Sequence, residues 1–198
     1  SRAYKSDNKA VATWLRIGQI RAQQIETEPY KKNQFIDALR EIRTLTRTEP
    51  GEFEPKLVEL CAQSGVAIVF EPEIKGARLN GVTRWVAPDQ ALIMLSLRHK
   101  TNDQFWFTFF HEAAHILLHG KREVFIDESD GIIDKKEAEA DEWAQDFLIP
   151  REAYEEFIEK DYFSRGDIEA FAQTQGIAPG IVLGRLQKEK WVPYQHKD

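Results

Sequence analysis

The chain contains very little sulfur: among its 198 residues there is one cysteine, Cys61, and one methionine. A single cysteine cannot form an internal disulfide, and it excludes a cysteine-rich metal site. Cys61 follows Leu57 and Leu60 at helical spacing, which favours a small buried side chain over a catalytic or redox thiol. A metal bound to this protein would therefore need histidine and carboxylate ligands.

Long apolar runs are also absent. The longest, at residues 66–70 and 91–95, have five residues each, whereas a membrane-spanning helix needs about 18 or more. The polar start, Ser-Arg-Ala-Tyr-Lys-Ser-Asp, has no secretory signal. We therefore expect a soluble cytoplasmic protein that makes no membrane contact. The chain does not begin with methionine, which suggests that a preceding segment is missing.

Basic residues are not in excess: 27 Lys and Arg stand against 33 Asp and Glu, so the formal net charge is −6. Phosphate binding requires a basic face, so this balance argues against nucleic-acid binding by bulk electrostatics. The apolar share of 42% and the charged share of 30% are typical of a folded globular chain. The length allows one or two modest domains with a real core.

Hydrophobic periodicity and Gly/Pro punctuation predict helices on both sides of a small group of strands. The predicted strands cover residues 66–70, 78–86 and 91–97. The predicted helices cover 9–25, 35–45, a stretch with Pro55 in its first turn that ends at Gly65, a stretch from Asn102 or Asp103 to Gly120, 134–148 before Pro150, 167–175 after Ser164, and 180–186 after Pro179.

The most informative segment is His111-Glu112-Ala113-Ala114-His115, an HExxH motif within a strongly helical stretch. Residues four apart lie on one helix face, about one turn from each other, so both imidazoles can reach one tetrahedral Zn²⁺. Glu112 then projects beside the position of a metal-bound water and can act as the general base.

A catalytic zinc site needs a third protein ligand. His119 shares the histidine face, but its Cα lies about 12 Å along the helix axis from that of His111. This favours a helix-end role for His119. On the following helix, Glu137 lies on the side of the apolar residues and Glu139 points outward as a surface carboxylate. We therefore predict Glu137 as the third ligand, with Asp141 accepting the free ring N–H of a ligating histidine.

In two segments the sequence resembles the ImmA/IrrE family of gluzincin-like metallopeptidases: His-Glu-Ala-Ala-His-Ile-Leu-Leu-His at 111–119, and Glu-Ala-Glu-Ala-Asp-Glu-Trp-Ala-Gln-Asp-Phe-Leu-Ile-Pro at 137–150. The resemblance covers about residues 57–150. It implies metal binding by His111, His115 and Glu137, with Glu112 as the general base. Asp141 stands where this family often has Asn, and Trp143 where Phe is usual.

Two N-terminal stretches are similar to the linker that joins an XRE-type DNA-binding domain to the peptidase-like domain in HigA-like antidote regulators. They are Trp-Leu-Arg-Ile-Gly-Gln-Ile at 14–20 and Phe-Ile-Asp-Ala-Leu-Arg-Glu-Ile-Arg at 35–43. This resemblance implies a zinc endopeptidase acting on a repressor, antitoxin or toxin, within transcriptional, toxin–antitoxin or stress regulation. DNA would be contacted only through a missing N-terminal domain. Residues 35–47 could also form a homodimer, although an intramolecular packing face would look the same.

The expected fold class is α+β, with a small mixed sheet packed against the HExxH helix and a second ligand helix. We predict a helical linker at 1–50, a zincin-like domain at 51–160 and helix-turn-helix-like C-terminal helices at 161–198. The strand at 91–97 could be a free edge for an extended substrate, or an ordinary structural edge.

Tyr154 and Tyr162 could stabilise an oxyanion, or be ordinary half-buried aromatics. Two further functions stay open. One is a regulator that recognises a partner protein without cutting it. The other is DNA binding by the C-terminal helices, which have few basic residues, so these helices could equally be a packing subdomain.

Overall fold

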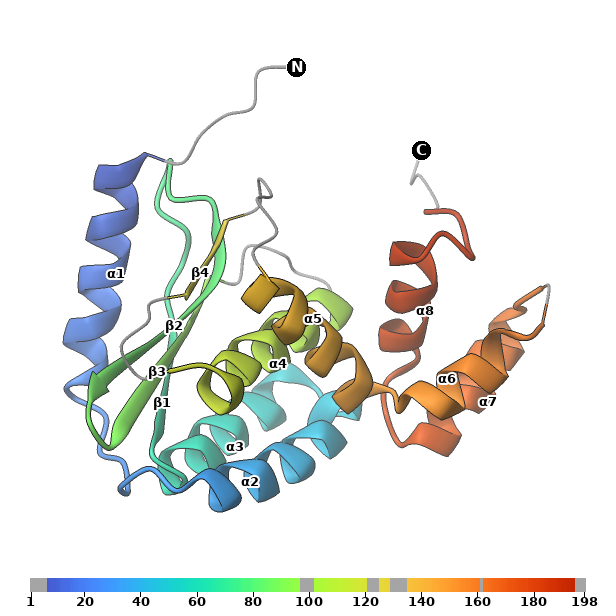
Figure 1. Ribbon diagram of the computed structural model, residues 1–198, viewed down its shortest axis with the longest axis horizontal. Helices are drawn as coiled ribbons and strands as arrows, with labels where there is room; N and C mark the ends of the chain where they lie inside the picture. The colour runs from blue at the N-terminus through green and yellow to red at the C-terminus, as the bar shows by residue number, and fades with distance from the viewer. Residues whose placement is uncertain (1–6, 97–101, 121–124, 129–134, 161, 195–198) are drawn as a thin grey trace.

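The computed structural model describes residues 7–96, 102–120, 125–128, 135–160 and 162–194 (Figure 1). These residues form eight α-helices, one short 3-10 helix and four strands. The strands are β1 (Val66–Phe70), β2 (Leu79–Ala87), β3 (Gln90–Leu95) and β4 (Phe125–Glu128). The helices are α1 (Asn8–Ala22), α2 (Lys32–Thr44), η1 (Leu45–Arg47), α3 (Pro50–Gln63), α4 (Asn102–Leu118), α5 (Lys135–Leu148), α6 (Arg151–Ile158), α7 (Arg165–Gln175) and α8 (Pro179–Lys188).

The four strands form one mixed sheet in the order β1-β3-β2-β4. β3 runs parallel to β1 and antiparallel to β2, and β4 pairs antiparallel with the other side of β2. The α+β prediction with a small mixed sheet is therefore confirmed. Both interpretations of residues 91–97 as an edge strand are wrong, because β3 (Gln90–Leu95) is paired on both sides. Residue 97 lies outside the described residues. An apolar run shows that a strand is buried, but it does not reveal which strands lie beside it.

Alternation along β1 and β3 builds a layer on each face of the sheet. Ile68 and Ile93 face the core made with α2, α3 and α4, whereas Val69 and Met94 face α1. Figure 1 shows α1 on one side of the sheet and these three helices on the other. A Cβ on Gly18 would meet the Met94 side chain at 2.1 Å, so this glycine allows α1 to approach the sheet closely.

Some boundaries differ from those that the sequence predicts. The third helix begins at Pro50, one turn before the prediction, so Pro55 lies inside the helix and not in its first turn. A proline at the first helical position is favourable because its missing N–H has no partner there in any helix. The short elements α6 and β4 were not predicted. The cap at Ser164 is confirmed, since its hydroxyl accepts from the N–H of Asp167 and the Asp167 carboxylate accepts from the Ser164 N–H.

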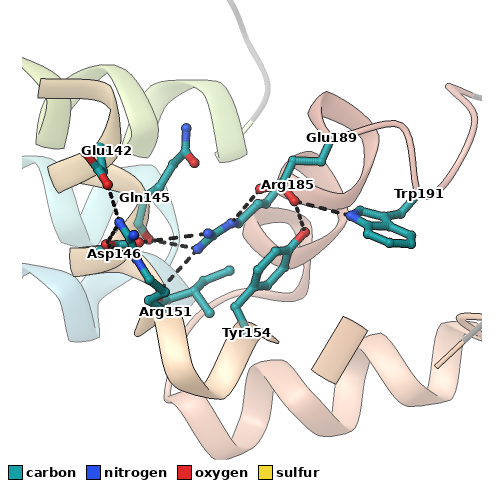
Figure 2. Close-up of polar contacts among 9 residues, drawn as sticks. Glu142, Gln145, Asp146, Arg151, Tyr154, Arg185, Glu189 and Trp191 are labelled. Carbon is teal, nitrogen blue, oxygen red and sulfur yellow. Dashed lines mark hydrogen bonds and ion pairs between the residues drawn. The ribbon is translucent and has the colours of Figure 1, made fainter. Parts of the chain in front are cut away.

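The carboxyl end of α5 is tied to two distant helices. Arg43 of α2 donates to the carbonyl oxygens of Phe147 and Leu148, at 2.8–3.1 Å. Arg185 of α8 donates to the carbonyl oxygens of Gln145, at 3.3 Å, and Ile149, at 3.1 Å (Figure 2). The last carbonyls of a helix have no partner within it and carry partial negative charge, so both guanidinium groups stabilise this end.

The core also settles the role of the cysteine. Cys61 is fully buried in the same cluster as Leu57, and burial raises the pKa of its thiol. This confirms the structural interpretation of Cys61. None of the helices in the described ranges is long and apolar enough to span a membrane. The division into residues 1–50, 51–160 and 161–198 stays a prediction.

Candidate metal centre

Helix α4 carries the HExxH motif through the middle of the molecule. Trp106, Phe109 and Phe110 are fully buried on it and pack into the main core. The motif residues are buried as well: His111 is 5% exposed, Glu112 0% and His115 2%. A polar group this deeply buried needs partners, because an unpaired one is costly to remove from water. The sequence placed these residues on a central helix, and the structure agrees.

Helix α5 brings the carboxylates to α4. Ala140 and Ala144 are fully buried on the face of α5 that packs toward the core, and such small side chains let two helices lie close together. Glu137 projects from this side with its side chain 27% exposed, and Asp141 follows one turn later with its side chain 40% exposed. The prediction that Glu137 points inward is thereby confirmed.

Three side chains converge on one point between the helices. The Nε2 atoms of His111 and His115 lie 3.0 Å apart. One carboxylate oxygen of Glu137 lies 3.1 Å from the Nε2 of His111, and the other lies 3.3 Å from the Nε2 of His115. Among the residues that the structure describes, these three form a group whose ligand atoms all lie within 4.8 Å of one another.

The spacing of these atoms fits a metal ion. A tetrahedral Zn²⁺ with bonds of about 2.0–2.1 Å holds its ligand atoms about 3.3 Å apart. The three separations above, 3.0–3.3 Å, are close to this value. Two imidazoles and one carboxylate are also the donor set of a catalytic zinc site, which keeps a fourth position open. His111, His115 and Glu137 could therefore hold a metal ion together.

The electrostatics of the site favour positive charge at this point. Burial alone would lower the pKa of His111, but hydrogen bonds with Asp141 and Glu137 outweigh it and raise this pKa to about 10. Burial raises the pKa of Glu137, yet its contacts with both histidines bring it down to about 2. For His115, burial dominates and lowers the pKa. The surroundings thus hold one carboxylate ionised and stabilise a cation beside it.

Asp141 orients the first histidine as predicted. Its Oδ1 lies 2.8 Å from the Nδ1 of His111, so it can accept the N–H that leaves Nε2 free for a metal. The other oxygen, Oδ2, lies 3.3 Å from the Nζ of Lys188 on α8. That ammonium lies 4.2 Å from the centre of the Phe107 ring. Lys188 was not identified from the sequence, because 47 residues separate it from Asp141.

Glu112 is held by the sheet. The hydroxyl of Thr83 on β2 lies 2.6 Å from Oε2 of Glu112 and 2.9 Å from its backbone oxygen. A Cβ on Gly81 would lie 2.5 Å from Oε1 of Glu112, so only glycine leaves room for this carboxylate. Neither residue was identified from the sequence, although a glycine inside a strand can signal close approach of another group.

Comparison with protein families agrees with this geometry. The family model described as an IrrE N-terminal-like domain, of the M78 peptidases, matches residues 61–186. The chain belongs to this family. Membership in this peptidase family supports the ImmA/IrrE resemblance of the sequence, and the matched range includes His111, His115 and Glu137. No curated protein gives a significant match to the chain.

The other candidate site residues of this M78 family member lie outside the cluster of His111, His115 and Glu137. Tyr154 is buried, and its hydroxyl lies 3.0 Å from Oε2 of Glu189, with the guanidinium of Arg185 3.7 Å from its ring centre (Figure 2). Tyr154 thus fits the interpretation as an ordinary packed aromatic. Tyr162 is 77% exposed. His119 lies outside the three-residue cluster but against His115, with their Nδ1 atoms 2.9 Å apart.

Proposed function

We propose that this protein is a zinc-dependent endopeptidase of the IrrE/ImmA type that acts on a regulatory protein. The observation that carries the proposal is the convergence of His111, His115 and Glu137 beside a fully buried Glu112. Membership in the M78 peptidase family supports it. The family match does not reach the residues before position 61, so the role of that part rests on the resemblance to a regulator linker.

Each residue has a distinct task in this proposal. The Nε2 atoms of His111 and His115 and the carboxylate of Glu137 would hold the zinc ion. When bound, the ion supplies Lewis-acid polarisation of the scissile carbonyl and lowers the pKa of water. Asp141 accepts the Nδ1–H of His111 and so keeps its Nε2 unprotonated and available as a ligand.

Glu112 performs the proton transfers. Its carboxylate takes a proton from the attacking water and later delivers this proton to the nitrogen of the leaving amine, while the C–N bond breaks. The hydroxyl of Thr83 fixes Oε2 of Glu112, and Gly81 leaves space for Oε1. The general base is therefore held in one orientation before any substrate binds, which reduces the ordering that the reaction requires.

The substrate proposed for this site is a repressor, antitoxin or toxin encoded beside the gene. An XRE-type DNA-binding domain ahead of residue 1 would then place the peptidase within a transcriptional or toxin–antitoxin regulator, in the cytoplasm. The resemblance of residues 14–20 and 35–43 to the linker of such regulators supports this arrangement.

The test combines metal analysis with cleavage. The purified protein should contain one zinc per chain and should cut one of the neighbouring regulatory proteins. Glu112→Gln should keep the zinc and slow cleavage by about 10²–10⁴-fold, the usual contribution of a general base. Full-rate cleavage by zinc-loaded Glu112→Gln would refute this role of Glu112. Stoichiometric zinc in a wild-type protein that cuts none of these partners would favour the non-cleaving regulator instead.

A further inference from the structure

His119 lies one turn beyond His115, at the end of α4. Its ring contacts that of His115, with centroids 5.0 Å apart. The His119 side chain is only 4% exposed, although the neighbouring Leu118 is 45% exposed. The ring is therefore turned inward, along the same helix face as the two motif histidines.

Both ring nitrogens of His119 face side chains. Nδ1 lies 2.9 Å from the Nδ1 of His115, and Nε2 lies 3.3 Å from Oε2 of Glu139. The other oxygen of Glu139 lies 3.7 Å from the Nζ of Lys135. A histidine that only caps the helix end would direct its ring at terminal carbonyls, which is the role predicted from the sequence. Glu139, predicted as a plain surface carboxylate, is instead a partner of His119.

The direction of each hydrogen bond follows from one constraint. If His115 offers its Nε2 lone pair to a metal, its single proton is on Nδ1, and this N–H must donate. The Nδ1 of His119 is then the acceptor, so the proton of His119 is on Nε2. That N–H points at the carboxylate of Glu139, which can only accept when ionised.

We propose that His119 is a positioning residue for the metal centre and that Glu139 fixes its tautomer. This inference rests on the proposed metal site. His119 holds the His115 ring in the tautomer and orientation that a metal requires, as Asp141 does for His111. Each motif histidine thus has its own outer partner, one a carboxylate on α5 and the other an imidazole directly after the end of α4.

Zinc affinity gives the first test, measured by competition with a chromophoric chelator. His119→Phe keeps a ring but removes the acceptor, and we expect it to weaken zinc binding by about 10–100-fold, as loss of an outer partner of a ligating histidine does. His119→Asn places an amide oxygen near the position of Nδ1 and should restore most of the affinity. Glu139→Leu should weaken binding by a few fold, because water can reach this half-exposed position.

Glu142→Gln is the matched control. Glu142 is an exposed carboxylate on the same helix as Glu139, and it pairs with Arg151 away from the histidines. Glu142→Gln removes one negative charge from α5, as Glu139→Leu does. If the two variants lost the same zinc affinity, the cause would be a general charge effect, and the role of Glu139 would be overturned.

The second test reads the tautomers directly, by long-range ¹⁵N–¹H NMR of the zinc-loaded protein with labelled histidine. We expect the proton of His115 on Nδ1 and that of His119 on Nε2. A proton on the Nδ1 of His119, or unchanged zinc affinity in His119→Phe, would overturn the proposal for His119 while leaving the metal site intact. A wild-type protein that does not bind zinc would refute the metal centre itself, and the inference with it.

Discussion

Helices α4 and α5 supply one centre by different means. The residues from α4 are almost completely buried, at 0–5% exposure, on a helix whose aromatic side chains form the core. The carboxylates from α5 have side chains that are 27–44% exposed. Packing therefore positions the helix that carries the histidines, while hydrogen bonds with Asp141 and His119 orient their rings. The acids depend on hydrogen bonds and on helix-end contacts. Changes in α4 should affect folding first, and changes in α5 should affect metal binding first.

The largest effect is expected from Phe109→Ala. This fully buried ring of α4 packs against Phe110 and Trp106, so its truncation should lower the free energy of unfolding by about 3–5 kcal/mol. Denaturant unfolding of the metal-free protein measures this loss. If Phe109→Ala left stability unchanged, the core would not be what holds α4.

Glu137→Gln should separate the two helices most clearly. The change removes the charged ligand, and we expect zinc affinity to fall by more than about 100-fold, beyond the range for outer partners. The free energy of unfolding of the metal-free protein should fall by much less than in Phe109→Ala, because the side chain is partly exposed, although its contacts with both histidines weaken. Chelator competition and thermal unfolding of the same samples test both halves of this expectation. A collapse of the metal-free fold would show that α5 also depends on Glu137 for its packing.

Asp141→Asn should have an intermediate effect. The amide oxygen can still accept from the Nδ1 of His111, but it lacks the negative charge that supports the ring. Zinc binding should weaken by about 10-fold, the lower limit for an outer partner. Asp146→Asn is a suitable control, since Asp146 is on the same helix and pairs with Arg151. Equal losses in the two variants would point to net charge and not to the contact with His111.

Lys188→Met should have the smallest effect. Methionine keeps a flexible apolar chain over the Phe107 ring but removes the ion pair with Asp141. The side chains of Lys188 and Asp141 are both about half-exposed. Such pairs contribute about 0–1 kcal/mol, so zinc affinity should fall by less than about fivefold. A change as large as that of Asp141→Asn would mean that Lys188 and Asp141 act as one unit.

The sequence predicts the parts of the site that depend on local periodicity. The HExxH spacing places His111 and His115 on one helix face, and the apolar face of the next helix selects Glu137 over Glu139. Thr83, Gly81 and Lys188 could not be found this way, because their contacts join residues 29 to 47 positions apart. The central position of β3 was missed for a similar reason, since strand order is a property of the whole sheet.

His119 shows both what helical periodicity predicts and what it cannot predict. Its distance along the helix axis from His111 argues against ligation, and the structure agrees by leaving it out of the cluster. The same spacing of four residues that joins His111 to His115 also joins His115 to His119. Periodicity thus indicates the contact between the rings, but the partner on the other side of His119 comes from α5 and depends on the packing of two helices.

The contacts of Arg185 with the carbonyls of α5 can form only late in synthesis (Figure 2). The chain leaves the ribosome from its N-terminus, so the HExxH helix and α5 emerge before α8. Arg185 can bind the carbonyls at the end of α5, and Lys188 can pair with Asp141, only after α8 has emerged. A nascent chain halted near residue 160 would contain every proposed zinc ligand, yet α5 would lack this support. The contacts that α8 adds to α5 and to Asp141 are therefore the last supports of the centre to form, after its three proposed ligands have all been synthesised.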